Sequence, residues 1–384
     1  MNIHIITRYE RLVDKYKKQL KVIDKPDNIM GFASHDCFTL EPFYEKINNL
    51  TEKEQKLYKT QEELPENSKL FAFIIQDKEL VQVREFLADK VYVDSLFINE
   101  GGFRWRYMVF IDGDKVSPRK IERILRNNEG GFKCYESYNG AYYQRYDYLY
   151  KNDSIEVFCK NYDGGKVISD HSLYIDTRDD QVNTITRTYK DKSSIVYDFK
   201  IAQLSIEDLL ESAKKYMIDA VMLALKQETI KEEILVVLFE YNCQTPLPPS
   251  VALGQSKEMQ AVRKEEDCSL LFYNAPDLYY FSEEDNLTVD FEEKGGAVFA
   301  SLNKKLLEMY EDEGLQEVCF NFYLDLSRTL KRKSSLKKLI SVHDDFHVTA
   351  RDFDTCNEWE FLQALLPQKQ IHSIQKELDY STCL

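Results

Sequence analysis

Hydrophobic and polar residues follow different periods in different parts of the chain, and the first hundred residues mix two of them. Apolar positions recur every three to four residues over 8–20 and 52–63, which predicts helices there. Residues 69–76, KLFAFIIQ, form a continuous apolar run typical of a buried strand, and residues 79–89 return to a helical period. The pattern predicts a mixed α/β N-terminal region over residues 1–102.

The period changes to two in the next hundred residues. Residues 103–112 predict a strand, and Ser117-Pro118 predicts the start of a short basic helix, with Ser at the N-cap and Pro at the first helical position. From residue 132 onward we expect a run of antiparallel strands joined by turn-rich segments such as 161–165. We expect a hairpin that begins at residue 132, followed by strands at 154–160, 166–176, 182–189 and 194–201. Residues 103–203 therefore predict a central antiparallel β-meander with one helix.

A tyrosine-rich hairpin opens this meander. Asn139-Gly140 is a strong hairpin signal because a type I′ turn needs positive φ at both central residues, so Tyr138 is expected to pair with Ala141. Counting outward from that pair, Glu136, Arg145 and Asp147 are among the residues of one face. The opposite face then holds five tyrosines, namely Tyr135, Tyr142, Tyr146, Tyr148 and Tyr150.

Two interpretations of the tyrosine face stay open. As part of a core, the face would pack on a helix such as the one expected at residues 118–126. As a binding surface, it would offer the rigid aromatic anchors that protein interfaces favour. The face has no phenylalanine, and a buried hydroxyl without a hydrogen bond costs about 1–3 kcal/mol. Several of the hydroxyls are therefore expected to reach water or a partner.

The last part of the chain predicts an α+β domain over residues 204–384. Ser205, with Asp208 three residues later, caps a long amphipathic helix, and the domain boundary is placed just before it. A continuous apolar strand, residues 234–239, is broken by Pro246, Pro248 and Pro249. Strands are also expected at 268–273, 278–281 and 339–342, helices at 297–310 and 315–330, and an amphipathic end at 359–378. The whole chain is predicted to be of the α+β class.

Composition and charge restrict the function. The 384 residues include 66 acidic and 51 basic side chains, which gives a net charge of -15. Phosphate backbones repel such a chain, so we expect a basic protein as the partner and not nucleic acid. With no long apolar run and no secretory signal, the expected location is the cytoplasm. The eight cysteines include no C-x-x-C pair, so we expect reduced thiols in place of zinc ribbons or disulfides.

One triplet resembles the site of restriction-endonuclease-like nucleases. Asp198-Phe199-Lys200 has their acidic-x-Lys spacing, and a strand would place both charges on one face. The resemblance implies that Asp198 holds a divalent metal, that Lys200 positions the attacking water and that Asp176 supplies a further acid. It covers only this strand pair, and the expected meander departs from the family order, in which a helix precedes the metal-binding strands. The alternative is an exposed ion pair.

A second cluster is His343-Asp344-Asp345-Phe346-His347. In a strand, His343, Asp345 and His347 share a face, but the outer two lie about 13 Å apart and cannot bind one metal. A turn at Asp344-Asp345 would bring them together as a metal site. The alternative is an ordinary Asp-rich turn.

Motifs of the common catalytic loops are absent from the sequence, including the P-loop, the GxSxG turn and the HExxH helix. We therefore expect a noncatalytic acidic protein-binding module without a cofactor, such as a bacterial inhibitor, immunity or defence component. The usage of Lys, Asn, Ile and Tyr with little Gly is typical of an AT-rich bacterial genome. The alternative is a metal-dependent nuclease or phosphodiesterase that uses Asp176, Asp198 and Lys200.

Overall fold

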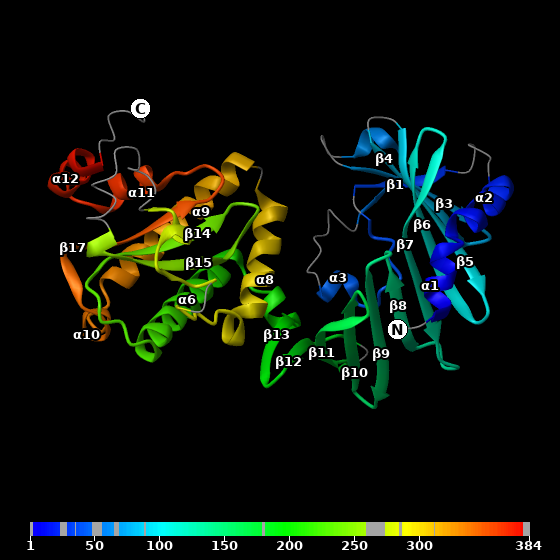
Figure 1. The fold of residues 1–384 in the computed structure, drawn as a ribbon, viewed down its shortest axis with the longest axis horizontal. Helices are drawn as coiled ribbons and strands as arrows, with labels where there is room; N and C mark the ends of the chain where they lie inside the picture. The colour runs from blue at the N-terminus through cyan, green and yellow to red at the C-terminus, as the bar shows by residue number, and fades with distance from the viewer. Residues whose placement is uncertain are drawn as a thin grey trace. The chain divides into compact units, whose positions relative to one another are not determined.

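The chain divides into two compact units, Met1–Phe199 and Lys200–Leu384 (Figure 1). The computed structural model describes residues 3–23, 29–34, 36–47, 56–64, 69–87, 90–178, 181–258, 273–283, 286–310 and 312–378. Within these residues, no helix combines the length and the apolar character that a membrane span needs.

Unit 1 is built on one antiparallel sheet of 13 strands, so the α+β class with a central meander is confirmed. The strand order is β13 through β3 in reverse sequence order, followed by β1 and β2. The strands before residue 102 and those from residue 103 to residue 198 therefore share one sheet. The strands are β1 (Ile29–Ala33), β2 (Leu57–Tyr58), β3 (Leu70–Gln76), β4 (Glu79–Leu87), β5 (Lys90–Glu100), β6 (Phe103–Asp112), β7 (Lys115–Arg126), β8 (Phe132–Tyr138), β9 (Tyr142–Lys151), β10 (Ser154–Asp163), β11 (Lys166–Asp176), β12 (Thr184–Tyr189) and β13 (Lys192–Asp198).

Three helix predictions in unit 1 are wrong. Residues 79–87 form β4, because Val81 and Val83 are β-branched and the segment pairs on both sides, with β3 and β5. Residues 115–126 form β7, and Pro118 is tolerated there because it lies at a register shift of the β6–β7 pair. The described part of residues 52–63 forms β2 and a short 3-10 helix, η2 (Gln61–Glu63).

Different segments cover the two faces of the sheet. The N-terminal helices α1 (Ile3–Glu10) and α2 (Leu12–Ile23) pack across β6, β7 and β8 on one face (Figure 1). Their core contains Ile5, Leu12, Tyr16, Trp105, Tyr107 and Tyr143. Residues 36–47, which end in α3 (Tyr44–Ile47), pack on the opposite face through Phe38, Leu40, Phe43 and Ile47.

Unit 2 has a mixed four-stranded sheet with a hydrophobic core on each face. The strand order is β16 (Tyr280–Phe281), β15 (Thr245–Gln255), β14 (Ile234–Asn242) and β17 (Val342–Asp352), and β14 runs parallel to β17. The helices are α5 (Phe199–Ala202), α6 (Ile206–Gln227), η5 (Ala275–Asp277), α8 (Glu292–Met309), α9 (Asp312–Lys331), α10 (Leu336–Leu339), α11 (Glu358–Leu365) and α12 (Gln368–Leu378).

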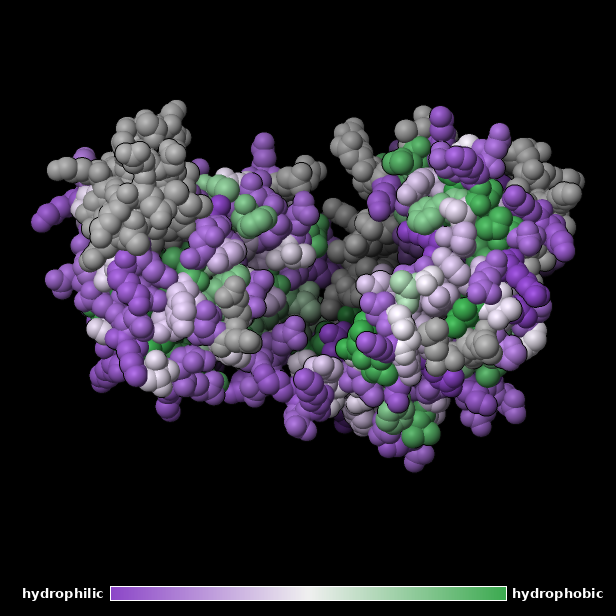
Figure 2. Space-filling model, in the orientation of Figure 1, coloured by the Kyte–Doolittle hydropathy of each residue, from purple (hydrophilic) through white to green (hydrophobic). Residues whose placement is uncertain are grey.

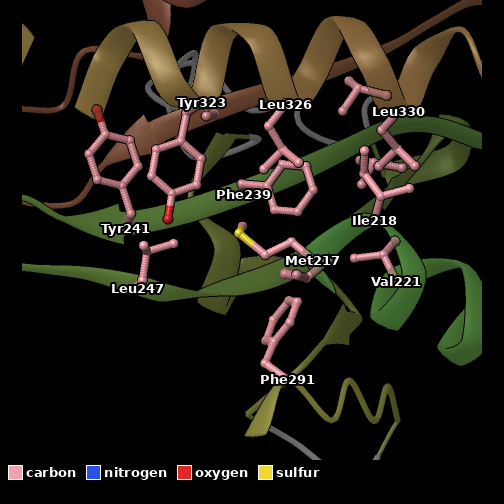
Figure 3. Packing of buried hydrophobic residues seen from close by; sticks show 14 of the residues in the cluster. Met217, Ile218, Val221, Phe239, Tyr241, Leu247, Phe291, Tyr323, Leu326 and Leu330 are labelled. Carbon is pink, nitrogen blue, oxygen red and sulfur yellow. The ribbon is translucent and has the colours of Figure 1, made fainter. Parts of the chain in front are cut away.

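The larger core of unit 2 lies between the sheet and the long helices (Figure 3). Met217, Ile218 and Val221 of α6 face Phe239 of β14, and Tyr241 stacks on Tyr323 of α9 with ring centroids 4.1 Å apart. Ser205 caps α6 as predicted, since its side chain accepts a hydrogen bond from Asp208 N. The apolar stripe of α6 therefore faces the sheet and excludes water from this core.

Two predictions for unit 2 are wrong. Pro246, Pro248 and Pro249 lie inside β15, where the β14–β15 register shifts and the ladder needs no donor from them. The Asn303 side chain binds both N and O of Leu247 in this irregular stretch, at 3.2 and 2.6 Å. The strand expected at residues 339–342 is replaced by the end of α10 and the start of β17. Residues 268–272 of another expected strand lie outside the described residues.

Candidate functional site

The tyrosine hairpin has a different register from the predicted one. Tyr138 pairs with Tyr143 and not with Ala141, because the Asn139 side chain accepts hydrogen bonds from the backbone N of Ala141 and of Tyr142, at 3.2 and 2.8 Å. The loop is therefore two residues wider than a type I′ turn. A shift of two residues leaves every side chain on its predicted face.

The five tyrosines of that face fall into two groups. Tyr135, Tyr146 and Tyr148 are buried under Leu40, Phe43 and Ile47, so residues 36–47 provide the cover that was expected from a helix at 118–126. The Tyr135 hydroxyl donates to Glu122 at 3.0 Å. Tyr142 and Tyr150 are 50% and 39% exposed.

The opposite face of the same strands carries a set of exposed apolar side chains that the sequence did not reveal. Leu149, Phe158, Tyr174 and Ile195 are each between 40% and 49% exposed. We call these four residues the apolar strip. Strand pairing links Leu149 to Glu156, Glu156 to Tyr174, Tyr174 to Thr186 and Thr186 to Ile195, so one row that contains three of the four residues crosses β9 to β13. Phe158 lies in the neighbouring row, where it pairs with Asp147 and Ser172. With strands about 4.8 Å apart, the row spans roughly 19 Å.

The strip lies on the face that α1 and α2 cover elsewhere. Their core includes Tyr143 of β9, with Tyr162 of β10 packed against it, and both residues belong to the same face as Leu149 and Phe158. In Figure 2, hydrophobic areas interrupt the hydrophilic surface of unit 1 near the β9 and β10 strands labelled in Figure 1. The helices thus protect one part of this face and leave the strip open to solvent.

Charged residues beside the strip form mutually compensating pairs. Arg145 binds both carboxylate oxygens of Asp147, at 2.8 and 2.7 Å. Lys151 binds Glu156, and Lys160 lies 3.9 Å from Asp170. An apolar centre with a polar rim is the usual anatomy of a protein interface.

Asp198 and Lys200 of the predicted nuclease site do not share a strand face. The strand β13 ends at Asp198, and Lys200 lies in α5, so the predicted placement is wrong. Asp176 pairs with Thr184, and Thr184 with Asp198, which separates the two acids by two strand spacings, about 10 Å. The Asp176 carboxylate is bound by Arg178 at 2.6 Å, and this hydrogen bond lowers its pKa.

The three residues of the predicted metal site have separate partners in β17. His347 is buried, with Nε2 3.2 Å from Tyr273 Oη and Nδ1 3.0 Å from Asp345 O. Burial lowers the pKa of His347 to about 4, so its ring is neutral at pH 7. His343 Nδ1 accepts from Asp345 N, and the Asp345 carboxylate accepts from Gln370. Among the described residues, no group of three or more His, Cys, Asp or Glu side chains is placed to hold a metal ion.

A further polar cluster, which the sequence did not indicate, lies where the parallel strands β14 and β17 end. Arg351 lies 3.8 Å from Glu240 and 3.5 Å from Glu358. Its Nη1 also donates to Asn274 Oδ1 at 2.9 Å. Glu240 and Asn274 are each more than seventy positions from Arg351 in sequence, so no local motif marks the cluster. The cluster ties β14, β17 and α11 together.

Two surfaces of unit 1 thus differ in their accessibility. The tyrosine face is largely core, whereas the strip on the other face is exposed. Comparison with known proteins adds no relative, since no family model, curated protein or solved structure matches the chain.

Proposed function

We propose that this protein is a noncatalytic protein-binding module and that the apolar strip is its contact surface. The observation that carries the proposal is that four large apolar side chains, those of Leu149, Phe158, Tyr174 and Ile195, are exposed on a sheet face that α1 and α2 cover only in part. A group of exposed apolar side chains with a polar rim marks interaction sites on soluble proteins. Phe158 and Tyr174 would be the central anchors, because aromatic side chains bury large area at low entropic cost.

The partner in this proposal is a basic protein. The net charge of -15 supports it, since opposite charge accelerates encounter over distances longer than the contact itself. The charges next to the strip compensate one another, so the strip itself would contribute apolar contacts to the bound complex. The net charge of the whole chain would accelerate the encounter with the partner. A bacterial inhibitor, immunity or defence protein would use a surface of this kind.

A cytoplasmic location belongs to the same proposal. Cys134, Cys159, Cys243 and Cys319 are buried free thiols of the described residues. Free thiols in apolar surroundings suit a reducing compartment, where disulfides do not persist.

The experiment compares matched double variants. Phe158→Ser with Tyr174→Ser removes the anchors, whereas Val167→Ser with Ile168→Ser removes two residues that are each 54% exposed at the β10–β11 hairpin. Proteins captured from the native host by the parent are purified, and their affinities for all three proteins are measured by calorimetry.

We expect a captured protein to bind the parent and the Val167→Ser, Ile168→Ser variant with equal affinity. It should bind the Phe158→Ser, Tyr174→Ser variant at least about tenfold more weakly, because a lost interface anchor typically costs about 2 kcal/mol or more. Equal affinity of all three proteins for every captured partner would exclude the strip as the contact surface.

A further inference from the structure

A pocket of about 540 Å³ opens on the tyrosine face of unit 1, away from the apolar strip. One wall comes from residues 41–47, and the floor comes from strands β9, β11 and β12. The lining side chains are Glu41, Tyr44, Ile47, Lys120, Gln144, Tyr146, His171, Leu173, Arg187 and Tyr189. A volume of this size is within the range of small-molecule sites.

Arg187 is the unusual residue of this pocket. Its Nε is buried without a hydrogen-bond partner, and the guanidinium forms no ion pair with any described residue. Other arginines of the same sheet are paired: Arg106 with Asp36, and Arg123 with Glu136. A guanidinium partly removed from water without an anion among the described residues is costly, so an anionic ligand would stabilise this arrangement.

The pocket's own acid compensates the charge of Arg187 only in part. Burial raises the pKa of Glu41 to about 7, so this carboxyl is partly protonated at neutral pH. The charge of Lys120 is taken up by Glu122, whose Oε1 lies 2.7 Å from Nζ. The cationic excess of the pocket is therefore that of Arg187.

Neutral hydrogen-bonding groups surround this charge. His171 pairs with Tyr189 across strands β11 and β12, and Leu173 pairs with Arg187 across the same two strands. Burial, followed by the charge of Arg187, lowers the pKa of His171, so its ring is neutral at pH 7 and offers one N–H donor. Gln144 Oε1 accepts from Ser137 Oγ at 2.9 Å, which leaves the amide NH2 as a further donor.

The remaining walls are aromatic and aliphatic. Tyr44, Tyr146 and Tyr189 contribute rings, and Ile47 and Leu173 contribute apolar surface. A charged centre within such walls suits a ligand that has a ring as well as an anionic group.

We propose that this pocket binds a small organic anion, with its carboxylate or phosphate on the Arg187 guanidinium and its ring among the tyrosines. Two parallel N–H···O bonds from a guanidinium fit either anionic group. The site lies on the opposite sheet face from the apolar strip, so it is a second binding function and does not depend on the first.

The test uses four probes on the full-length protein. Phenyl phosphate and phenylacetate combine a ring with each anionic group, inorganic phosphate supplies only the anion, and phenol supplies only the ring. Binding is followed by calorimetry and by the melting temperature, which rises when a ligand binds the folded state. The variants are Arg187→Gln, Arg187→Lys and, as a control, Arg178→Gln, which removes an arginine whose side chain is 67% exposed.

We expect at least one ring-bearing anion to bind the parent and Arg178→Gln alike, and at least about tenfold more tightly than inorganic phosphate or phenol. Arg187→Gln should lose that binding while melting at or above the parent temperature, and Arg187→Lys should bind with intermediate affinity. The stronger of the two ring-bearing probes identifies the anionic group.

Three results would overturn the proposal. The first is no binding of either ring-bearing anion to the parent at 10 mM, about the weakest affinity expected of a fragment-sized ligand. The second is unchanged binding by Arg187→Gln. The third is that both Arg187 variants, without ligand, melt at a lower temperature than the parent protein. That result would mean that Arg187 stabilises the fold and does not serve a ligand.

Discussion

Arg106 and Arg187 lie in the same sheet, but among the described residues only Arg106 has carboxylate partners. Arg106 is buried, with Nη2 2.8 and 2.7 Å from the two Asp36 oxygens and Nη1 3.7 Å from Glu122 Oε2. Arg187 has no such anion among the described residues. The first arrangement is typical of a structural ion cluster, and the second leaves a charge available to a ligand.

Removal of Arg106 should therefore destabilise the protein strongly. Arg106→Gln leaves Glu122 buried with less compensation, and breaking a buried pair costs about 3–5 kcal/mol. Urea unfolding should show a loss of this order, whereas Lys160→Gln, at the exposed pair with Asp170, should lose about 1 kcal/mol or less. Similar small losses in both variants would mean that the buried cluster does not stabilise unit 1.

The titration of Glu41 gives a pH-dependent prediction. Burial raises its pKa from 4.5 to about 7, so the folded protein binds this proton more tightly than the unfolded chain does. The resulting stability is present below pH 4.5 and is lost as the pH rises through 7. Lys120, Glu122 and Tyr146 are the charged or titratable groups that act on Glu41. The charge of Lys120 and the hydrogen bond with Tyr146 oppose the rise in pKa, and the charge of Glu122 adds to it.

Glu41→Gln removes this titration. We expect the variant to melt about 3 °C higher than the parent at pH 8, and the difference to shrink as the pH falls to 4.5. Melting curves at four pH values measure the trend, with Glu45→Gln, an exposed carboxyl on α3, as the control. A difference that is constant across the pH range would contradict the raised pKa.

At the scale of elements, two adjacent residues of β9 lie on opposite faces of the sheet, one in a core and the other exposed. Tyr148 is 9% exposed and belongs to the tyrosine core, and Leu149 is 49% exposed in the apolar strip. Tyr148→Ala should cost about 3 kcal/mol or more, since it empties a packed site. Leu149→Ala should change stability by less than about 1 kcal/mol. Denaturant titrations of both variants test the assignment of faces, and equal losses would refute it.

The elements themselves show what the sequence could predict. Residues 103–112 and 166–176 were predicted as strands and match β6 and β11 to the residue. Both begin directly after a glycine pair with positive φ, which marks the preceding turn. The segments 79–87 and 115–126 were predicted as helices, yet pairing with neighbouring strands overrides their local pattern. Ladder pairing between distant segments is a tertiary property that local periodicity does not contain.

The two proposed surfaces were beyond the sequence for a related reason. Strand β10 carries apolar residues on both faces, such as Val157 on the core side and Phe158 in the strip. Which face remains open depends on where α1, α2 and residues 36–47 pack, and these contacts join residues roughly a hundred positions apart. In the same way, Arg187 is distinctive only because no described residue pairs with it.

At the scale of the whole molecule, the net charge of -15 predicts how association depends on salt. With a basic partner, the association rate should fall as salt rises from 0.01 to 0.15 M, because the Debye length shrinks from about 30 to about 8 Å. The dissociation rate, which depends on the strip, should change less. Stopped-flow measurements over this range test both rates, and an association rate independent of salt would rule out electrostatic attraction.

The most direct test of the protein-binding proposal is hydroxyl-radical footprinting of the side chains, with and without a partner captured by the parent protein. We predict that the oxidation rate of the Phe158 and Tyr174 side chains falls several-fold in the complex, because contact with the partner removes them from water. Val167 and Ile168, which are exposed outside the strip, should be oxidised at the same rate in both samples. Unchanged oxidation of Phe158 and Tyr174 in a complex that is fully formed would contradict the account.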